Sequence, residues 1–306
     1  MDWGTAMSGF ARYQRAGGLS EKTITNRAES LGLVARLTGS GPLDVTEDDL
    51  LDMLSRQHPR TGRPLAAGTK QSERSYYQTF FSWLQAKGHR ADNPAAGLPK
   101  VKIPRRKPRP LRIQQVDAML DSGAYKRTRD IITIAALSGL RIGEIVKIRG
   151  EDIDVEGGVL RSLRKGALEH VIALHPVLLD LARDYPRSGW WFPSPHRNEM
   201  FPTGGGHILM KSASDRVSKA IRNAGITDRN LTGHSLRHFY ATTMLKNGVN
   251  IRVVQELLGH ASLATTQLYT EVDQDDMRGG VAALPPIDLR ERSRRRARGE
   301  SGKMAA

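Results

Sequence analysis

The sequence predicts a mainly α-helical protein of two domains, with a small antiparallel β-sheet in the second. Apolar residues recur at three-to-four spacing behind capping residues through most of the chain. A run rich in proline and basic residues interrupts this pattern at 98–110, and one stretch at 157–174 alternates apolar and polar residues instead. We therefore expect a helical domain over 1–97, a linker over 98–110, a second domain over 111–275 and an arginine-rich tail over 276–306.

Composition limits the classes of partner. The chain has 306 residues, of which 39% are hydrophobic, and this is enough for two domains that each bury a core. The formal charge of +15 exceeds what solubility requires and favours a polyanion such as double-stranded DNA, with an acidic membrane surface as the competing partner. No run approaches the roughly 18 apolar residues of a membrane span, and the first residues lack a secretion signal. We expect a cytoplasmic protein with no membrane association.

Cysteine is absent, so the sequence excludes disulfides, thiolate nucleophiles and cysteine-based zinc sites. Any covalent chemistry must use oxygen or nitrogen.

Three helices are expected in the first domain. Ser20 precedes a helix that ends at Gly39, and Thr46 caps a second helix with Asp49 as its reciprocal partner. The third helix, at 69–88, carries an aromatic band that is more typical of a core than of a base-stacking surface. The band consists of Tyr76, Tyr77, Phe80, Phe81 and Trp83.

The linker "LPKVKIPRRKPRP" contains four prolines, which exclude regular structure, and six basic residues. It is either a solvated hinge or a strap that lies along DNA phosphates while the two domains grip opposite sides of a duplex. The candidate phosphate contacts are Lys100, Lys102, Arg105, Arg106, Lys107 and Arg109.

The second domain begins with an apolar helix that ends near Gly139, and another helix starts at "RIGEIVKI". The alternating stretch predicts a β-hairpin with Lys165 near its tip. Further helices are expected at 177–185, 208–225, 235–248, 252–259 and 262–270.

Two arginines at predicted helix starts suggest a phosphate site. His234 and Arg237 lie three residues apart and project from the same side of a helix start. A helix N-terminus attracts anions, and arginine adds a planar fork that can bind two phosphate oxygens. Arg141 opens another helix, with Glu144 one turn on to hold it. Together the two arginines would stabilise the charge that develops on a pentacovalent phosphorus.

Phosphoryl chemistry of this kind also needs a nucleophile and an acid. A phenol, with a pKa near 10, gives an oxyanion that can attack phosphorus and leave again, which suits reversible exchange. Tyr269 is the candidate nucleophile, and helix packing is its alternative role. A departing 5′-oxygen needs a proton, which Lys165 at the hairpin tip would donate.

Four segments resemble, in this order, the conserved boxes of the tyrosine recombinase (phage integrase) family. They are "ALSGLRIGEIVKIRGEDID", "LRKGALEHVIALHP", "HSLRHFYATTML" and "LLGHASLATTQLYT". The resemblance covers 111 to about 273. It implies a two-domain clamp, with a helical core-binding domain and an α+β catalytic domain. It also implies that the catalytic residues are Arg141, Lys165, His234, Arg237, His260 and Tyr269. The sequence departs from the family pattern after Lys165, where Ala167, Leu168, Glu169 and His170 replace further basic residues.

The mechanism that the resemblance implies is attack by Tyr269 on the scissile phosphate, giving a 3′-phosphotyrosyl link. Neither a metal nor a nucleotide cofactor is then required. Four protomers would join two short attachment-type DNA sites, with a host DNA-bending or directionality factor as a further partner. A temperate phage or a mobile element is the expected owner, so integration or excision is the expected role. Resolution of chromosome or plasmid dimers, a topoisomerase-like relaxing enzyme and a non-catalytic DNA-binding protein are the alternatives.

Two other groups of residues are candidate metal sites. His234 and His238 have a metal-pair spacing, with His260 as a third ligand, although Arg237 lies between them and no adjacent Glu supplies a base. Glu144 and the acids of 151–154 are compatible with a two-metal nuclease, against which stands a solvated or structural role.

The tail carries two further predictions. Val281–Leu284 would fill a pocket of a neighbouring protomer, while the arginines that follow hold phosphate. The last three residues, Met304–Ala306, are similar to the small apolar tails by which cytoplasmic ATP-dependent proteases recognise substrates, and an ordinary frayed end is the alternative.

Overall fold

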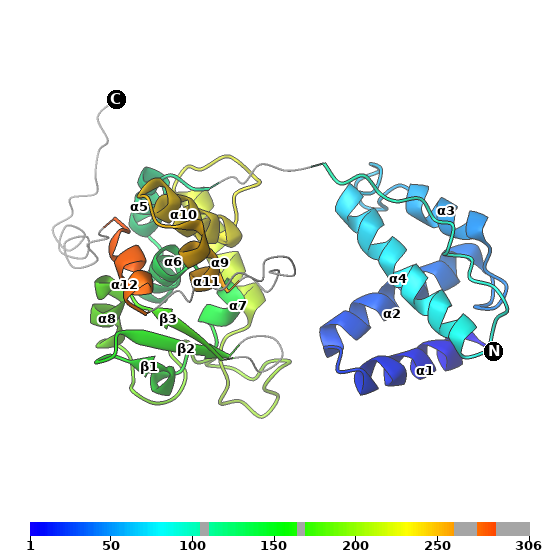
Figure 1. Ribbon diagram of the computed structural model, residues 1–306, viewed down its shortest axis with the longest axis horizontal. Helices are drawn as coiled ribbons and strands as arrows, with labels where there is room; N and C mark the ends of the chain where they lie inside the picture. The colour runs from blue at the N-terminus through cyan, green and yellow to red at the C-terminus, as the bar shows by residue number, and fades with distance from the viewer. Residues whose placement is uncertain (105–109, 164–168, 260–273, 286–306) are drawn as a thin grey trace. The chain divides into compact units, whose positions relative to one another are not determined.

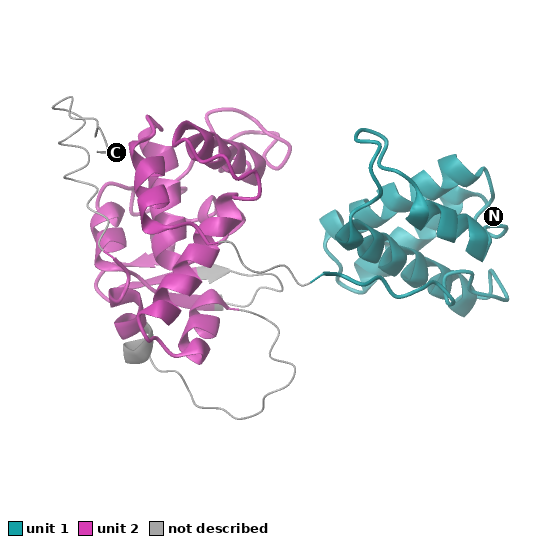
Figure 2. Cartoon of the chain, turned by 90° about the horizontal axis from the view of Figure 1, so that it is seen from above, with its two compact units in different colours: residues 1–106 teal, residues 107–306 magenta. Residues whose placement is uncertain are grey.

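A computed structural model of the chain describes residues 1–104, 110–163, 169–259 and 274–285. The chain divides into two compact units, 1–106 and 107–306, which are coloured separately in Figure 2. Each unit has its own cluster of buried apolar side chains.

The first unit is all-helical over its described residues. Its helices are α1 (Trp3–Ala16), α2 (Glu21–Thr38), α3 (Glu47–Ser55) and α4 (Ala67–Ala86). The predicted caps are confirmed: the Ser20 hydroxyl accepts a hydrogen bond from the Thr23 N–H, and α2 ends at Gly39 with φ 69°. At α3 the Thr46 and Asp49 side chains each accept a hydrogen bond from the other residue's backbone N–H.

Helix α1 was not expected from the sequence. The Asp2 carboxylate caps it by accepting a hydrogen bond from the Thr5 N–H at 2.8 Å. Its inner face buries Ala6 and Phe10, and the Phe10 ring lies 5.3 Å from the ring of Phe80 in α4. The first residues of the chain thus contribute directly to the core of unit 1.

The aromatic band of α4 belongs to the core, as predicted. Tyr77, Phe80 and Phe81 are fully buried, and Trp83 is nearly so. Edge-to-face packing of Phe80 on Phe10 and Phe81 adds specific geometry to the area that these rings bury.

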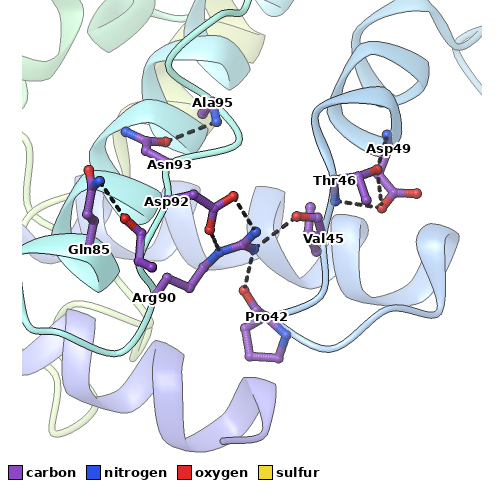
Figure 3. Close-up of polar contacts among 10 residues, drawn as sticks. Pro42, Val45, Thr46, Asp49, Gln85, Arg90, Asp92, Asn93 and Ala95 are labelled. Carbon is purple, nitrogen blue, oxygen red and sulfur yellow. Dashed lines mark hydrogen bonds and ion pairs between the residues drawn. The ribbon is translucent and has the colours of Figure 1, made fainter.

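Arg90 fastens the segment after α4 to the connection between α2 and α3 (Figure 3). Its guanidinium donates to the carbonyls of Val45 at 2.9 Å and Pro42 at 3.3 Å. Asp92 accepts two further hydrogen bonds from the same group, at 2.8 and 3.0 Å. Because these contacts link parts of the chain more than forty residues apart, they fix the end of α4 beside the Thr46 cap.

The second unit is built around one buried helix. Its helices are α5 (Ile113–Asp121), α6 (Lys126–Ser138), α7 (Ile142–Ile145), α8 (Pro176–Ala182), α9 (Met210–Asn223), α10 (Gly233–Lys246), α11 (Ile251–Leu258) and α12 (Gln274–Ala282). Every residue of α6 from Ile131 onward is buried, and α5, α8, α9 and α10 pack around it (Figure 1). Within the residues described, no helix is both long and apolar enough to cross a membrane.

A small antiparallel sheet lies beside these helices. Its strands are β1 (Ile153–Asp154), β2 (Val159–Leu163) and β3 (Glu169–Ala173), in the order β1-β2-β3. Leu163 pairs with Glu169, which confirms the predicted hairpin, and residues 164–168 between them lie outside the described chain. Helices with one small antiparallel sheet are the fold class that the sequence predicts.

The expected start of the tail, at 276, falls inside α12. Val281 and Leu284 are 1% and 3% exposed and belong to the core of their own unit. Asn247 at the end of α10 donates to the Ala283 carbonyl at 2.6 Å. The prediction that Val281–Leu284 fill a neighbouring protomer is therefore wrong for this structure. The two apolar residues, three positions apart, complete the core of the chain that carries them.

The Arg56–Glu73 pair gives a test of how unit 1 is stabilised. The two side chains, 16% and 11% exposed, are joined by hydrogen bonds of 2.6 and 2.7 Å. We expect Arg56→Met to lower the free energy of unfolding of unit 1 by about 3 kcal/mol, because Glu73 is left nearly buried without its counter-charge. Urea-dependent hydrogen exchange of the α4 amides in the full chain measures the change.

Two variants control for this experiment. Arg56→Met combined with Glu73→Leu should regain most of the loss, because no unpaired charge remains. Arg15→Met, which breaks the exposed pair with Glu21, should leave the α4 amides unchanged. Wild-type exchange in Arg56→Met alone would show that the pair does not stabilise the unit.

Candidate active site

The end of α6 leads directly into the site. Gly139 ends this helix with φ 65°, a conformation that favours glycine. A Cβ atom there would lie 2.6 Å from the Tyr240 ring and 2.8 Å from a Leu258 methyl group, so no larger residue fits. The turn that Gly139 permits places Arg141 at the N-cap of α7.

Arg141 is held by Glu144, as the sequence predicts. One carboxylate oxygen accepts from the Arg141 backbone N–H at 2.8 Å, and the other accepts from its guanidinium at 2.9 Å. The Arg141 side chain is nevertheless 46% exposed. Its charge is therefore oriented by the protein and open to an anion from solvent.

Arg237 projects from the first turns of α10 into the protein. It is 3% exposed, and its two terminal nitrogens donate to the carbonyls of Gly139 and Leu258, both at 2.6 Å. Gly139 is the C-cap of α6, and Leu258 is the last residue of α11. Both carbonyls therefore lie at the negative ends of helix dipoles. The buried guanidinium thus joins three helix ends.

The start of α10 is fixed by a reciprocal cap. The Thr232 hydroxyl accepts from the His234 N–H at 3.3 Å, and the Ser235 hydroxyl accepts from the Thr232 N–H at 3.1 Å. His234 therefore lies in the first turn, one turn before His238, and the two rings meet edge to face at 4.8 Å.

The pKa of His234 lies below its ordinary value of 6.5. Partial loss of solvent around the ring is the main cause, and the charges of His238, Arg237 and Arg141 add to it. The imidazole is therefore neutral at neutral pH. Arg237 is bonded to the carbonyl of Gly139, two residues before Arg141. His234 lies about one turn before Arg237 in α10, so the fold brings the two arginines and the histidine together.

The β-sheet is attached to the same region through α11. The His170 ring, on β3, forms a 2.8 Å hydrogen bond with the Glu256 carbonyl through Nε2. Asn250 caps the start of α11, and Gly259 ends it with φ 54°. Strand β3, which follows the segment that contains Lys165, is thus bonded to α11. The segment that begins with His260 follows the same helix in the sequence.

The remaining predicted residues lie outside the described residues or belong to unit 1. Lys165, His260 and Tyr269 fall in the undescribed segments 164–168 and 260–273. Lys100 and Lys102 are exposed and lie in no helix or strand, and the other predicted linker contacts are undescribed. These are Arg105, Arg106, Lys107 and Arg109.

The positions of the described residues do not support the two metal-site alternatives. Among the described residues, no group of three or more His, Asp or Glu side chains is placed to hold a metal ion. A cation at the His234–His238 pair would meet the same repulsion from two arginines that lowers the pKa of His234. His260, the third ligand of that alternative, is undescribed.

The acids of the nuclease alternative have structural roles. Glu144, Glu151, Asp152 and Asp154 accept hydrogen bonds from the backbone N–H groups of Arg141, Gly189, Arg149 and Gly157, respectively. The bonds of Glu144, Asp152 and Asp154 are local caps, whereas Glu151 links two segments 38 residues apart.

The carbonyls of Gly139 and Leu258 are the part of the site that sequence reasoning missed. A carbonyl has no residue-specific signature. The only available signals are the helix-ending glycines Gly139 and Gly259, which mark where unpaired C-terminal carbonyls occur.

Comparison with known proteins agrees with this fold. Residues 110–276 match the phage integrase family. The tyrosine recombinase XerC of Xylella fastidiosa (strain M23) is 31% identical over 301 residues, which cover 94% of this chain and 97% of that protein. The integrase from mycobacterium phage Brujita is 30% identical, with a TM-score of 0.52 and coverage of 94% and 96%. A lambda integrase (75-356) dimer bound to a COC′ core site shares the fold, with 19% identity, a TM-score of 0.69 and coverage of 89% and 100%.

The family match and the identity with XerC over nearly the whole chain identify a tyrosine site-specific recombinase. The chain belongs to the phage integrase family. It is accordingly an enzyme of DNA recombination.

The charges around His234 give a prediction for this site. We expect Arg141→Ala to raise the pKa of His234, because one repelling charge is removed, while burial still keeps it below 6.5. The midpoint is measured by NMR titration of the His234 ring. Lys147→Ala removes an exposed charge just beyond α7 and should leave the midpoint unchanged. Identical midpoints in wild type and Arg141→Ala would contradict the assignment.

The same shift has a consequence for stability. Because the folded-state pKa is below the unfolded-state value, the unfolded chain binds more protons near pH 6. The contribution of His234 to the free energy of unfolding should therefore decrease as the pH falls through about 6.5. Arg141→Ala should weaken this pH dependence, which is measured by urea unfolding of wild type and variant at a series of pH values.

Proposed function

We propose that this protein cuts and rejoins duplex DNA at a short specific site through a 3′-phosphotyrosyl intermediate on Tyr269. The observation that carries the proposal is the position of Arg237, which is bonded to the Gly139 carbonyl two residues before Arg141 and to the Leu258 carbonyl. His260 and Tyr269 follow Leu258 in the sequence. A nucleophile on this segment therefore starts from the end of α11 that the arginine fixes.

In this mechanism Arg141 binds the scissile phosphate, since its half-exposed guanidinium is already oriented by Glu144. Arg237 supplies fixed positive potential from its buried position, and such preorganised charge stabilises a pentacovalent phosphorus most effectively. His234, neutral at neutral pH, accepts or donates a hydrogen bond at the phosphate and relays a proton with His260.

Lys165 is proposed as the acid that protonates the departing 5′-oxygen. The phosphotyrosine bond conserves the energy of the cleaved phosphodiester, so strand joining needs no nucleotide cofactor. Cationic side chains do the work that a metal does in other phosphoryl transfers.

The assembly follows from stoichiometry. Exchange between two duplexes cuts four strands, and each protomer carries one Tyr269. We therefore propose four protomers on two DNA sites, with a DNA-bending or directionality factor of the host as a further partner. A role inside the bacterial cytoplasm is consistent with the bacterial relative.

Two biological roles fit the relatives. Integration or excision of a phage or mobile element is supported by the phage integrase at 30% identity. Resolution of chromosome or plasmid dimers is the second candidate, favoured by the match to a bacterial XerC over nearly the whole of both chains. Sequencing the DNA attached to Tyr269 in cells separates them: integration predicts ends of one mobile element, and dimer resolution predicts one recurring site on the chromosome or plasmid.

The nucleophile is tested with a nicked suicide duplex in the presence of EDTA. Wild type should accumulate a covalent protein–DNA adduct, whereas Tyr269→Phe should bind the duplex equally and form none, because only the attacking oxygen is lost. Tyr13→Phe, which removes an exposed hydroxyl from unit 1, should behave as wild type. An adduct in Tyr269→Phe would exclude this residue, and activity that needs added metal would revive the metal alternative.

The acid is tested with a bridging 5′-phosphorothiolate. We expect Lys165→Ala to block cleavage of ordinary DNA and to cut the sulfur-containing substrate at nearly the wild-type rate, because a thiolate leaves without a proton. Single-turnover cleavage of both substrates measures the ratio. Equal defects on the two substrates would assign Lys165 a different role.

The linker is tested through salt dependence. Neutralising Arg105, Arg106 and Lys107 together should weaken binding to all duplexes and reduce the slope of log affinity against log salt by about three, if each residue neutralises one phosphate. Fluorescence anisotropy at several salt concentrations measures the slope. An unchanged slope would identify the linker as a solvated hinge.

A further inference from the structure

A basic cavity lies in unit 2 at the start of α6, at the opposite end of this helix from Arg141. Its volume is about 660 Å³. One wall is the segment 123–128, and the other is the exposed face of α9, with Arg216, Lys219 and Asn223. Helix α6 separates the cavity from Arg141, and its 13 residues span about 20 Å. We call this the α6–α9 cavity.

Three cations in the cavity have no counter-charge. Arg127, Arg216 and Lys219 are exposed, and within the described residues none of them forms an ion pair. Lys126 differs, because Asp130 accepts a hydrogen bond from its ammonium group at 3.0 Å and Asp184 forms an ion pair with it at 3.5 Å. The protein thus places two carboxylates beside one lysine at the rim, and the four cations keep an excess of about two positive charges around the cavity.

The start of α6 adds to this positive potential. The helix has no acidic residue in its first turn, and its N-cap, Tyr125, gives no side-chain hydrogen bond to the backbone. Positive side chains at the positive end of a helix dipole are mutually unfavourable, and an anion relieves both.

A hydroxyl group also lines the cavity. Thr128 is 4% exposed as a residue and belongs to the cavity wall. A hydroxyl can donate one hydrogen bond. An anionic oxygen in the cavity would accept it.

Tyr125 indicates what the anion carries. Its side chain is 87% exposed at the rim of the cavity, which leaves an aromatic face open to solvent. An exposed ring beside a group of cations is how proteins bind a nucleotide without reading its sequence: the ring stacks on the base, and the cations hold the phosphate.

We propose that the α6–α9 cavity binds nucleotide phosphate, with the adjoining base stacked on Tyr125. The ligand is either a free nucleotide or one nucleotide of a DNA strand outside the duplex that is cut. Arg127, Arg216 and Lys219 contact the phosphate oxygens, together with the Thr128 hydroxyl. The site is independent of the catalytic residues, so it adds a second nucleotide contact to the same unit.

The test uses the full chain and a fluorescent N-methylanthraniloyl derivative of ATP, followed by anisotropy. Wild type should bind the probe, and Arg216→Ala with Lys219→Ala should weaken binding by about tenfold or more, because two charge-assisted contacts are lost. Arg222→Ala with Arg229→Ala removes the same charge from exposed positions that do not line the cavity, and it should bind as wild type. Equal weakening in both double variants would show only non-specific attraction and would overturn the proposal.

Two further variants locate the bound probe. Arg141→Ala should leave probe binding unchanged, whereas loss of binding would place the probe at the active site instead. Tyr125→Ala should weaken binding of the nucleotide and leave competition by inorganic phosphate unaltered. Equal effects on both ligands would remove the base-stacking part of the proposal.

Competition identifies the source of the nucleotide. Displacement of the probe by ATP at lower concentration than by a short single-stranded oligonucleotide indicates a free nucleotide, and the reverse order indicates a DNA strand. Displacement by a polyglutamate peptide but by neither nucleotide form would indicate an acidic protein partner and refute the proposal. Suicide-duplex cleavage by Arg216→Ala with Lys219→Ala reports on recombination separately, so failure of this proposal is distinguishable from failure of the proposed function.

Discussion

The arrangement of the active site depends on the buried guanidinium of Arg237. A cation that is 3% exposed is costly to bury unless it is well paired, and here the partners are two helix-end carbonyls, each at 2.6 Å. Both carbonyls lie at the negative ends of helix dipoles, which favours the charge further. The chain continues from one carbonyl to Arg141 and from the other to His260. One side chain therefore sets the starting points of the two segments that are proposed to carry catalytic residues.

Among the described residues, the two arginines of the cluster are paired in different ways. Glu144 is bonded to Arg141, whereas Arg237 donates to backbone carbonyls. In the proposed function, a phosphodiester would bring negative charge to the site and compete with Glu144 for Arg141. Because the cations are positioned before the phosphate arrives, little reorganisation is needed when charge develops on phosphorus.

Sequence reasoning succeeds where the signal is local. The caps at Ser20 and Thr46, the helix end at Gly39 and the β2–β3 hairpin each depend on a few neighbouring residues. Helix α1 was overlooked although Asp2 is a good cap and Ala6 and Phe10 lie one turn apart, because two glycines weaken its helical propensity.

Burial of Arg237 is a different case. Its type and spacing mark it as a phosphate-site residue, but its partners lie 98 and 21 positions away, and only the packing of α6, α10 and α11 brings them together.

The separate hydrophobic cores of the two units have a consequence of their own. Each unit is a complete folded body, so for a ligand that contacts both, binding by the first unit makes the second contact intramolecular. The second contact then forms at an effective concentration set by the reach of the linker and independent of the concentration of protein. Lengthening the linker would thus weaken the overall avidity while every contact with the ligand stays the same.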